Sequence, residues 1–480
     1  MDRPAIPLSA LAGLLAIIFV WALSLPSQAQ ETPPNIVLVV VDDLGWADVG
    51  FNGNARYDTP RLDSLAGEGL VFTQAYAAAA NCAPSRATIM SGRYAPYHGI
   101  YTVGNSDRGK DAYRRLVPTP NNTVLADSVV SLPEQLARAG YHSIHIGKWH
   151  LGADARTQGF IRNVAGYQAG HPKTYFSPFR LPFLADRMPG ENLTDRLTDE
   201  AIQYVHEQAG RPFFLYLPYY AVHTPLEGKP ELVEKYRGRP GIRNLRQATY
   251  AAMVETMDHN VGRLMQAIHE LGLDENTLFI FTSDNGGIAA LTPQDPLRAG
   301  KGSYYEGGIR VPTFFRWPGK ISAGQSEAPV IHHDLYPTLL HVVGLAPDRK
   351  LDGLDLLPHL LRGESLPERP LFWHFPIYLQ AYQPGADGGR DPLFRTRPGS
   401  VLRSGNWKLH HYFEDNGLEL YNLSTDPGEQ HDLAAEEPER ARRLFDTLEA
   451  WRQANGAPVP ATPNPDYDAA VEQEAIRQVE

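Results

Sequence analysis

Cysteine is almost absent from this chain of 480 residues, since Cys82 is the only one. One cysteine cannot form an internal disulfide, so the fold must be stabilised by packing and by any metal ion that it binds. A basic excess is absent too, because 44 lysines and arginines face 55 aspartates and glutamates, for a net charge of −11. Such a surface argues against nucleic acid or an anionic membrane as the main partner. Internal repeats are also missing, and 42% hydrophobic with 21% charged residues is typical of a globular protein.

The first thirty residues have the composition of an export signal. Arg3 precedes a long apolar run over residues 8–25, and the small residues Ser27 and Ala29 fit a cleavage site. The alternative is an uncleaved anchor, because the run is just long enough to span a bilayer. We expect residues 1–30 to be a signal peptide that is removed. The mature protein is then secreted, or periplasmic in a bacterium, and has no stable membrane association.

Apolar, β-branched runs alternate with helical patterns through most of the chain. This alternation predicts an α/β fold, with a mainly parallel sheet sandwiched between helices, over residues 31–370. The expected strands cover residues 35–43, 141–149, 212–220, 277–287 and 313–319, and the expected helices cover residues 59–69, 131–140 and 250–272. Ligands of such sheets bind at the carboxyl ends of the strands, so polar residues that end these runs are the first candidates for a site.

The sequence pattern changes after about residue 370. Residues 400–433 read as short alternating strands joined by turns, and residues 437–456 have helical spacing. We therefore predict a smaller C-terminal subdomain over residues 371–457, made of a small antiparallel sheet and a helix. Residues 374–398 are expected to form a surface loop near a ligand site. Residues 458–480 are expected to form a flexible tail.

Carboxylate and amide side chains end two of the predicted strands. Asp42 and Asp43 end the first, and Asp284 and Asn285 end another, followed by two glycines that allow a sharp turn. Each residue alone fits a turn or a helix cap. Together they supply only oxygen ligands, which calcium and magnesium prefer over zinc. The sequence therefore predicts a calcium or magnesium site at this edge of the sheet.

Basic side chains and histidines follow the other predicted strands. Lys148 and His150 lie just past one strand, His223 lies past another, and Lys301 lies between two glycines. Each of these residues has a structural interpretation when taken alone. We expect them at the same sheet edge as the carboxylates, and this shared position indicates a functional site.

Cys82 lies at or just before the predicted N-terminus of a helix, because Pro84 suits the first helical turn. One interpretation is a small buried hydrophobic residue, the commonest state of a free cysteine. A second is a thiolate nucleophile with a histidine base. A reactive thiol in an exported protein is liable to oxidation. Neither interpretation explains Pro84 and Arg86.

Residues 82–93, CAPSRATIMSGR, resemble the signature of the type I sulfatases, in which the cysteine of a C-x-P-x-R core is oxidised to Cα-formylglycine. The chain also contains VDDLGWADVG, DTPRLDSLAGEG, GKWHLG, FTSDNGG and GKGSYYEGGIRVP in the order of that family. The similarity extends over residues 35–433. The resemblance implies an alkaline-phosphatase-like fold with a small C-terminal domain, a formylglycine-generating maturation enzyme as partner, and one calcium ion.

The resemblance also assigns roles to individual residues. The implied calcium ligands are Asp42, Asp43, Asp284, Asn285 and the modified Cys82. The implied catalytic residues are Cys82, Arg86, Lys148, His150, His223 and Lys301. One hydroxyl of the hydrated formylglycine would attack sulfur, while His223 and Lys301 protonate the leaving oxygen. The second hydroxyl would lose its proton to His150 and expel sulfate, with Arg86 holding the hydrate and Lys148 the sulfate oxygens.

The substrate class is an expectation from several weaker features. Export, an acidic surface and an aromatic loop fit an exo-acting sulfatase of sulfated polysaccharides or oligosaccharides. The alternatives are a phosphonate monoester or phosphodiester hydrolase of the same superfamily, a general aryl sulfatase, and a non-catalytic carbohydrate-binding relative. Candidate contacts to the leaving group, chosen from loop position, are Tyr97, His98, His171, Tyr304, His374 and Arg395.

Overall fold

The computed structural model describes residues 33–208 and 210–479. The expected signal peptide, residues 1–30 with the apolar run at residues 8–25, lies outside the described residues. Among the residues that are described, no helix is both long enough and apolar enough to cross a membrane. Residues 34–480 group into one unit by their contacts.

Strand β1 (Asn35–Val41) lies near the centre of an eight-stranded sheet. The sheet order is β5-β4-β6-β1-β7-β8-β2-β9, and the strands from β5 to β7 run parallel. Strand β8 is antiparallel to both β7 and β2. The bounds of the other strands are β5 (Arg162–Val164), β4 (His142–Ile146), β6 (Phe213–Pro218), β7 (Thr277–Ser283), β8 (Phe314–Arg316), β2 (Leu70–Phe72) and β9 (Gly324–Ser326). The mainly parallel sheet expected from the sequence is confirmed.

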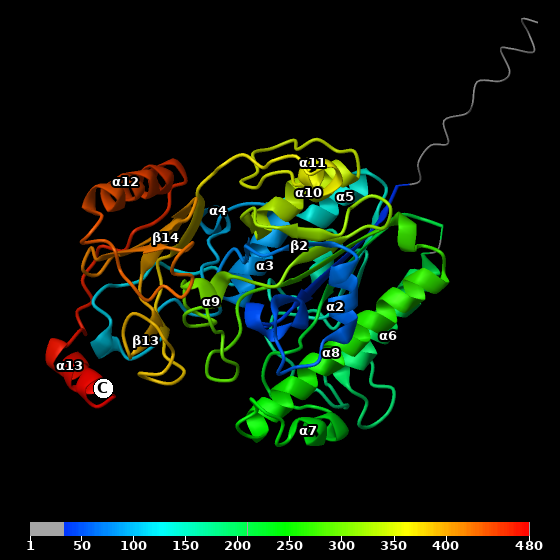
Figure 1. The fold of residues 1–480 in the computed structure, drawn as a ribbon, viewed down its shortest axis with the longest axis horizontal. Coiled ribbons are helices and arrows are strands. Elements are labelled where there is room, and N and C mark those ends of the chain that lie inside the picture. The colour runs from blue at the N-terminus through cyan, green and yellow to red at the C-terminus, as the bar shows by residue number, and fades with distance from the viewer. Residues whose placement is uncertain (1–32, 209, 480) are drawn as a thin grey trace, which may run out of the picture. The chain divides into compact units, whose positions relative to one another are not determined.

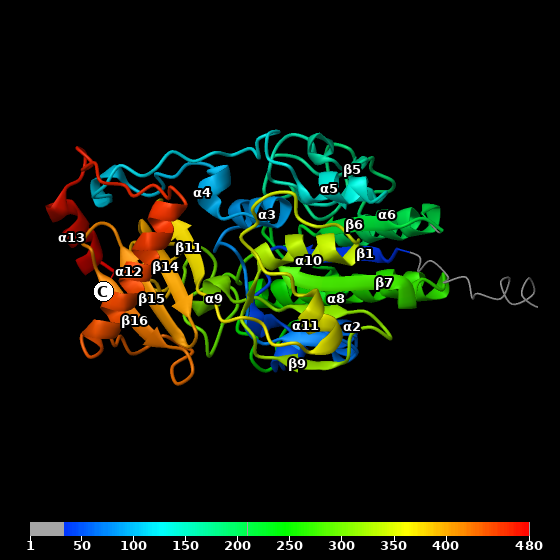
Figure 2. The same cartoon turned by 90° about the horizontal axis from the view of Figure 1, so that it is seen from above.

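Helices cover both faces of this sheet (Figures 1 and 2). Successive side chains of a strand point to opposite faces, so Val37 and Val39 enter one apolar core while Ile36 and Leu38 enter another. The first core includes residues of α2 (Pro60–Gly67), α6 (Leu193–Glu207) and α8 (Leu245–Glu270). The second includes residues of α3 (Cys82–Ser91), α5 (Leu132–Arg138), α10 (Leu335–Val342) and α11 (Leu357–Arg362). The predicted sandwich of helices around the sheet is confirmed.

A four-stranded antiparallel sheet follows in the C-terminal part of the chain, with α12 (Pro438–Ala454) packed on one face (Figure 2). Its order is β11 (Leu371–Phe375), β14 (Gly399–Ser404), β15 (Trp407–Tyr412) and β16 (Leu418–Asn422). Leu402 and Leu409 pack with Leu448 and Trp451 of the helix in a separate apolar cluster. The expected combination of a small antiparallel sheet and a helix is therefore present.

The structure differs from expectation in the segment that was predicted to be a flexible tail. Helix α13 (Ala469–Arg477) lies there, and the buried carboxylate of Glu472 is 2.7 Å from a guanidinium nitrogen of Arg397. Ile476 and Val479 pack against a small apolar cluster that includes Phe394. These partners are far away in the sequence, so the local composition of the segment does not report them.

The remaining elements are short and connect the two sheets or extend their loops. The loop expected over residues 374–398 contains a strand pair, β12 and β13. The bounds are β3 (Ala75–Tyr76), β10 (Val330–Ile331), β12 (Leu379–Gln380), β13 (Phe394–Thr396), α4 (Ala95–His98), α7 (Pro230–Tyr236) and α9 (Glu306–Ile309). Short 3-10 turns cover Trp46–Asp48, Gly50–Asn52, Asp111–Tyr113, Ala155–Gln158, Asp274–Asn276 and His332–Asp334.

Candidate functional site

Four polar residues converge where two neighbouring central strands end. Asp42 and Asp43 follow β1, Asp284 and Asn285 follow β7, and all four are buried. Asn285 Nδ2 donates a hydrogen bond of 2.9 Å to Asp43 Oδ1. Asp43 has a φ of 62°, so the chain turns through the left-handed region directly after the strand. The convergence predicted from the strand ends is therefore present.

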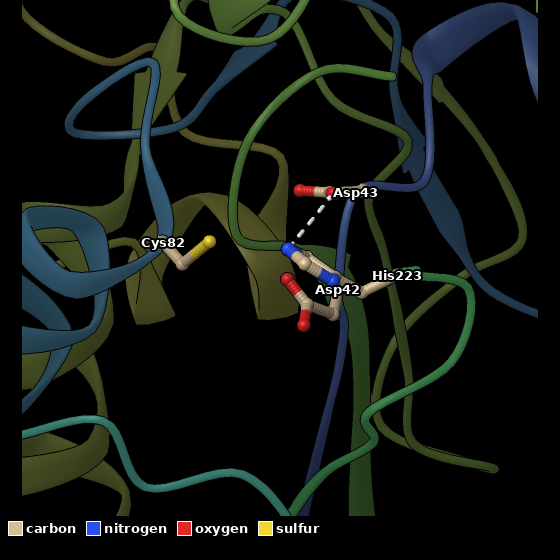
Figure 3. Close-up of side chains that lie close together, drawn as sticks. All are labelled: Asp42, Asp43, Cys82 and His223. Atoms are coloured by element: carbon tan, nitrogen blue, oxygen red, sulfur yellow. Dashed lines mark ion pairs between the residues drawn. The ribbon is translucent and has the colours of Figure 1, made fainter. Parts of the chain in front are cut away.

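Cys82 is the first residue of α3 and faces these carboxylates (Figure 3). One ligand atom from each of Asp42, Asp43, Cys82 and His223 lies within 4.8 Å of the other three, which makes the group a candidate metal site. The Cys82 side chain is buried, and burial raises the pKa of its thiol to about 12 even though Lys148 and Lys301 oppose the change. The thiol is therefore neutral at neutral pH, which argues against a thiolate nucleophile.

Each carboxylate of the site has one cationic partner. Lys148 Nζ is 2.7 Å from Asp42 Oδ2, and Lys301 Nζ is 2.7 Å from Asp43 Oδ1. Arg86 pairs with Asp284 Oδ2 at 2.7 Å and also donates to the Lys148 carbonyl oxygen at 2.9 Å. These cations come from α3 and from loops that follow β4 and β7. The structure thus brings together the predicted carboxylates and the predicted basic residues.

Two oxygen atoms of the site remain unsatisfied. Asp42 Oδ1 and Asn285 Oδ1 are buried and have no hydrogen-bond partner among the described residues. Burial raises the pKa of Asp42 to about 8, although Lys148 opposes this. Burial would also raise the pKa of Asp43, but the charge of Lys301 opposes it most strongly, and that pKa lies well below its usual range. Buried oxygens without partners are costly, so their arrangement suits a hard cation that coordinates oxygen.

The two predicted histidines lie at the same edge of the sheet. His223 donates from Nδ1 to the Thr224 carbonyl oxygen at 2.8 Å, and its Nε2 is 3.6 Å from Asp43 Oδ2 (Figure 3). Burial, together with Lys301, lowers the pKa of His223 to about 3. His150 is also buried, and its Nδ1 has no hydrogen-bond partner among the described residues. Burial lowers its pKa well below the usual value, and the neighbouring Lys148 adds to this effect. Both rings are therefore neutral at neutral pH.

Comparison with known proteins identifies the family of this chain. A family model described as Sulfatase matches residues 34–345, which is more than half of the chain. The chain belongs to the sulfatase family. A second model, described as the C-terminal part of N-sulphoglucosamine sulphohydrolase, matches residues 300–453 of this sulfatase.

Individual relatives resemble the sulfatase over nearly its whole length. A sulfatase of Formosa agariphila is 34% identical to it over 88% of this chain and 90% of its own. The N-acetylgalactosamine-6-sulfatase of Mus musculus is 32% identical over 93% of this chain and 91% of its own. Among solved structures, Ps i-CgsB is 30% identical, has a TM-score of 0.74 and covers 93% of this chain and 98% of its own. The protein is thus a sulfuric ester hydrolase with the alkaline-phosphatase-like fold, which the motifs predicted.

The six residues proposed from loop position to contact the leaving group divide into two groups. His171 stacks on His223, with ring centroids 5.9 Å apart, and Arg395 donates to the Lys301 carbonyl oxygen at 3.1 Å. The other four have partners elsewhere: Tyr97 lies under Arg93, His98 contacts Thr88, Tyr304 stacks on Phe375, and His374 bonds Ser400 and the Pro458 carbonyl. The contacts of these four side chains thus do not involve the residues at the strand ends, and their contact with a leaving group stays a prediction.

Tyr175 is a site residue that the sequence did not indicate. Its hydroxyl oxygen lies 2.5 Å from the Tyr220 carbonyl oxygen and 2.9 Å from the His223 carbonyl oxygen, which share its single hydrogen. It therefore holds the backbone that carries His223. Tyr175 lies in a loop 48 residues before His223, and no local pattern marks it.

Proposed function

We propose that this sulfatase hydrolyses sulfate esters of carbohydrates, removing sulfate from the end of a polysaccharide or oligosaccharide, with Cys82 matured to formylglycine beside a calcium ion. One observation supports this more than any other: Cys82 lies within 4.8 Å of the carboxylates of Asp42 and Asp43, in a chain that belongs to the sulfatase family. A formylglycine at this position would lie next to oxygen ligands and cations. This is the chemistry that transfer of an anionic group requires.

The donor atoms at the strand ends fit calcium. The unpaired Asp42 Oδ1 and Asn285 Oδ1 are both oxygens, and the carboxylates of Asp43 and Asp284 lie beside them. These four residues would hold the ion, together with an oxygen of modified Cys82. When bound, calcium would supply positive charge against the three carboxylates and polarise a neighbouring oxygen.

Conversion to formylglycine would let position 82 supply a nucleophile, which the unmodified thiol of Cys82 does not. Cys82 lies in the sequence Cys-Ala-Pro-Ser-Arg, and its thiol is buried and neutral. A hydrated aldehyde at this position would supply an oxygen nucleophile and place an oxygen near the metal ligands. The proposal includes a maturation enzyme as partner, because the chain itself supplies no oxidant for Cys82.

The basic residues would stabilise the sulfate group. Arg86, Lys148 and Lys301 reach the site from three different segments, and each pairs with a carboxylate. Their charge, added to that of a divalent cation, exceeds the charge of Asp42, Asp43 and Asp284. A pocket of net positive charge favours an anionic ester whose bridging oxygen gains negative charge as the S–O bond breaks.

Lys301 and His223 would assist departure of the alcohol. Both contact the Asp43 carboxylate, from different loops. Asp43 outweighs burial and raises the pKa of Lys301 well above its usual value, so this side chain carries a proton. His223 donates its Nδ1–H to the Thr224 carbonyl oxygen, so Nε2 of the neutral ring faces Asp43 without a proton, and His223 would assist the leaving oxygen only after it takes up a second proton. His150 Nδ1 has no hydrogen-bond partner among the described residues, and His150 is the candidate base for restoring the aldehyde.

The names of the relatives support a carbohydrate substrate. The mouse relative is named for N-acetylgalactosamine 6-sulfate, and the structure of Ps i-CgsB was also solved with k-i-k-neocarrahexaose. We place the mature sulfatase in the periplasm or outside the cell, without stable membrane association, because of the predicted signal at residues 1–30.

Two measurements test this function. Peptide mass spectrometry of protein co-expressed with a maturation enzyme should find the mass of an aldehyde at Cys82, and a peptide with thiol alone would contradict the modification. A panel of defined sulfated saccharides, read by sulfate release, should include substrates that are hydrolysed at their non-reducing end. Faster turnover of a matched phosphonate or phosphodiester would contradict the substrate assignment.

The assignment of the proton donors has its own test. Lys301→Met should slow esters of poor leaving groups, such as sugar sulfates, roughly 10²- to 10⁴-fold. The phenolate of an aryl sulfate leaves without protonation, so the variant should slow the hydrolysis of aryl sulfates much less. Equal losses for both classes would show that Lys301 acts on the sulfate group and not on the leaving oxygen.

A further inference from the structure

Arg395, on β13, has a buried guanidinium group that forms no ion pair with a carboxylate in the described part of the chain. Its Nε donates to the Gln380 carbonyl oxygen at 3.0 Å and its Nη1 to the Lys301 carbonyl oxygen at 3.1 Å. The Tyr382 ring covers one face, 3.5 Å from the guanidinium carbon. Nη2 has no hydrogen-bond partner among the described residues and is not fully buried. The group is thus held rigidly, with one edge free.

Arg397, two residues further along the chain, is a buried arginine of the same region that does have carboxylate partners. It is as buried as Arg395, but it pairs with Asp391, with Glu414 at 2.9 Å and with Glu472 at 2.7 Å. A buried charge without a counter-ion is costly, and proteins normally pair it. Arg395 therefore lacks the partner that its neighbour has.

Arg108 adds a second unmatched cation beside the first. The chain next to it lies against the β12–β13 pair, because a Cβ added at Gly109 would be 2.8 Å from Phe394 Cε1 and 3.5 Å from Gln380 Cβ. Arg108 is half-buried and forms no ion pair or hydrogen bond within residues 33–208 and 210–479. Burial lowers its pKa, and the nearby Arg395 lowers it further. Two guanidinium groups that repel each other favour an anion between them.

The two arginines adjoin the catalytic site through Lys301. Arg395 bonds the backbone of Lys301, and the ammonium of the same residue contacts Asp43. A single lysine residue thus separates the Arg395 guanidinium from the carboxylates at the strand ends. The acid Asp387 accepts at Oδ2 from the backbone N–H groups of Tyr382 and Gln383, and among the described residues it forms no ion pair with Arg108 or Arg395.

We propose that Arg108 and Arg395 form a subsite for a second anionic group of the substrate, a sulfate ester or a carboxylate on the sugar ring or on its neighbour. The proposal rests on the proposed function, because it takes the sulfate at the Cys82 site as the group that is hydrolysed. Guanidinium groups bind both oxyanions through paired N–H donors, so the two chemistries share one subsite. The substrate class is then a saccharide that carries at least two anionic groups.

The test measures how well saccharides inhibit hydrolysis of 4-nitrophenyl sulfate. The three competitors are N-acetylgalactosamine 6-sulfate, its 4,6-disulfate, and a disaccharide that joins the 6-sulfate to glucuronate. One of the two dianionic competitors should bind more tightly than the first, and which one does so distinguishes sulfate from carboxylate. Arg108→Ala should reduce the ratio of the inhibition constants of the monoanionic and dianionic competitors about 10-fold, which is the usual contribution of a partly exposed charged hydrogen bond to affinity.

Two further variants control the measurement. Lys110→Ala removes a neighbouring exposed cation whose ammonium contacts Tyr113, and it should leave the ratio of inhibition constants unchanged. Arg108→Lys should keep part of the advantage, because the charge remains while the paired donors are lost. Equal binding of all three competitors, or an unchanged ratio in Arg108→Ala, overturns the subsite. Absence of any sulfate hydrolysis would instead overturn the proposed function.

Discussion

Two buried ionic clusters in this sulfatase differ in one respect. The strand-end cluster contains Asp42, Asp43, Asp284, Lys148, Lys301 and Arg86. The Lys408 cluster, where β15 meets α9, consists of Lys408, Glu306 and Glu429 and is completely buried. Both consist of carboxylates and cations at ion-pair distance. Only the first is proposed to carry out chemistry.

The difference lies in the satisfaction of oxygen atoms. In the Lys408 cluster, Glu306 accepts from Lys408 and from Tyr76, while Glu429 accepts from Lys408, His410 and the backbone N–H of Glu306. Every carboxylate oxygen there has a partner. In the strand-end cluster, Asp42 Oδ1 has none among the described residues. A closed network stabilises a fold, whereas an unsatisfied one is prepared for a ligand.

The largest expected effect comes from loss of Cys82, which faces the strand-end cluster. Cys82→Ala should lower kcat/KM for a sulfate ester by roughly 10⁴- to 10⁶-fold, as the loss of a catalytic nucleophile does elsewhere. The thermal unfolding midpoint serves as control and should change little, because alanine fits the first turn of α3. Full activity in this variant would refute the mechanism.

Removing the cation of the Lys408 cluster should lower the stability of the fold instead. Lys408→Met removes the ammonium that Glu306 and Glu429 share and leaves Glu306 paired, among the described residues, with Arg310 alone, at 3.6 Å, which should cost about 3–5 kcal/mol in the free energy of unfolding. Urea unfolding measures this. Adding Glu306→Gln and Glu429→Gln to the same chain should recover part of the loss. A single variant as stable as the parent would show that the cluster is not what we describe.

Calcium should stabilise the protein by binding to the strand-end cluster. At a calcium concentration about 100 times the Kd, binding to the folded state adds about 2.7 kcal/mol to the free energy of unfolding. Asp42→Asn should lose this calcium-dependent gain. Asp258→Asn is the matched control, because Asp258 is also buried but accepts from the backbone N–H groups of Arg61 and Leu62. If the control loses the gain as well, calcium acts elsewhere.

The smallest expected effect is a pH dependence of the stability that the Lys408 cluster contributes. Burial alone would raise the pKa of Glu306, but Lys408 outweighs it and holds that pKa below the ordinary value of 4.5. The ion pair therefore stabilises the fold above about pH 4.5, and this contribution is lost as the pH falls, because the unfolded state then binds more protons.

Glu306→Gln should remove this dependence. Between about pH 6 and pH 3, the free energy of unfolding of the parent should fall more steeply than that of the variant, by up to about 1.4 kcal/mol per pH unit. Glu439→Gln, at an exposed position of α12, should keep the slope of the parent. Parallel slopes in parent and Glu306→Gln would contradict the account.

Local patterns in the chain were sufficient for the centre of the site. A parallel strand that ends in polar residues presents them at a common edge, so Asp42, Asp43, Asp284 and Asn285 were found from apolar runs alone. The motif around Cys82 added Arg86 and the family. Local signals were weaker for helices: α8 begins at Leu245 and not near residue 250. Helix α6 was not predicted, and its buried face mixes apolar residues with the polar Thr194, Arg196 and Thr198.

Long-range contacts between loops were decided only by the folded chain. Arg395 meets Lys301 across 94 positions and Tyr175 meets His223 across 48, and neither pairing has a periodicity that a sequence displays. Of six loop residues proposed to contact the substrate, His171 and Arg395 contact residues of the site. Periodicity reports which side chains are buried, because burial repeats along an element. Which loops meet depends on how separate elements pack, and that is a property of the tertiary structure.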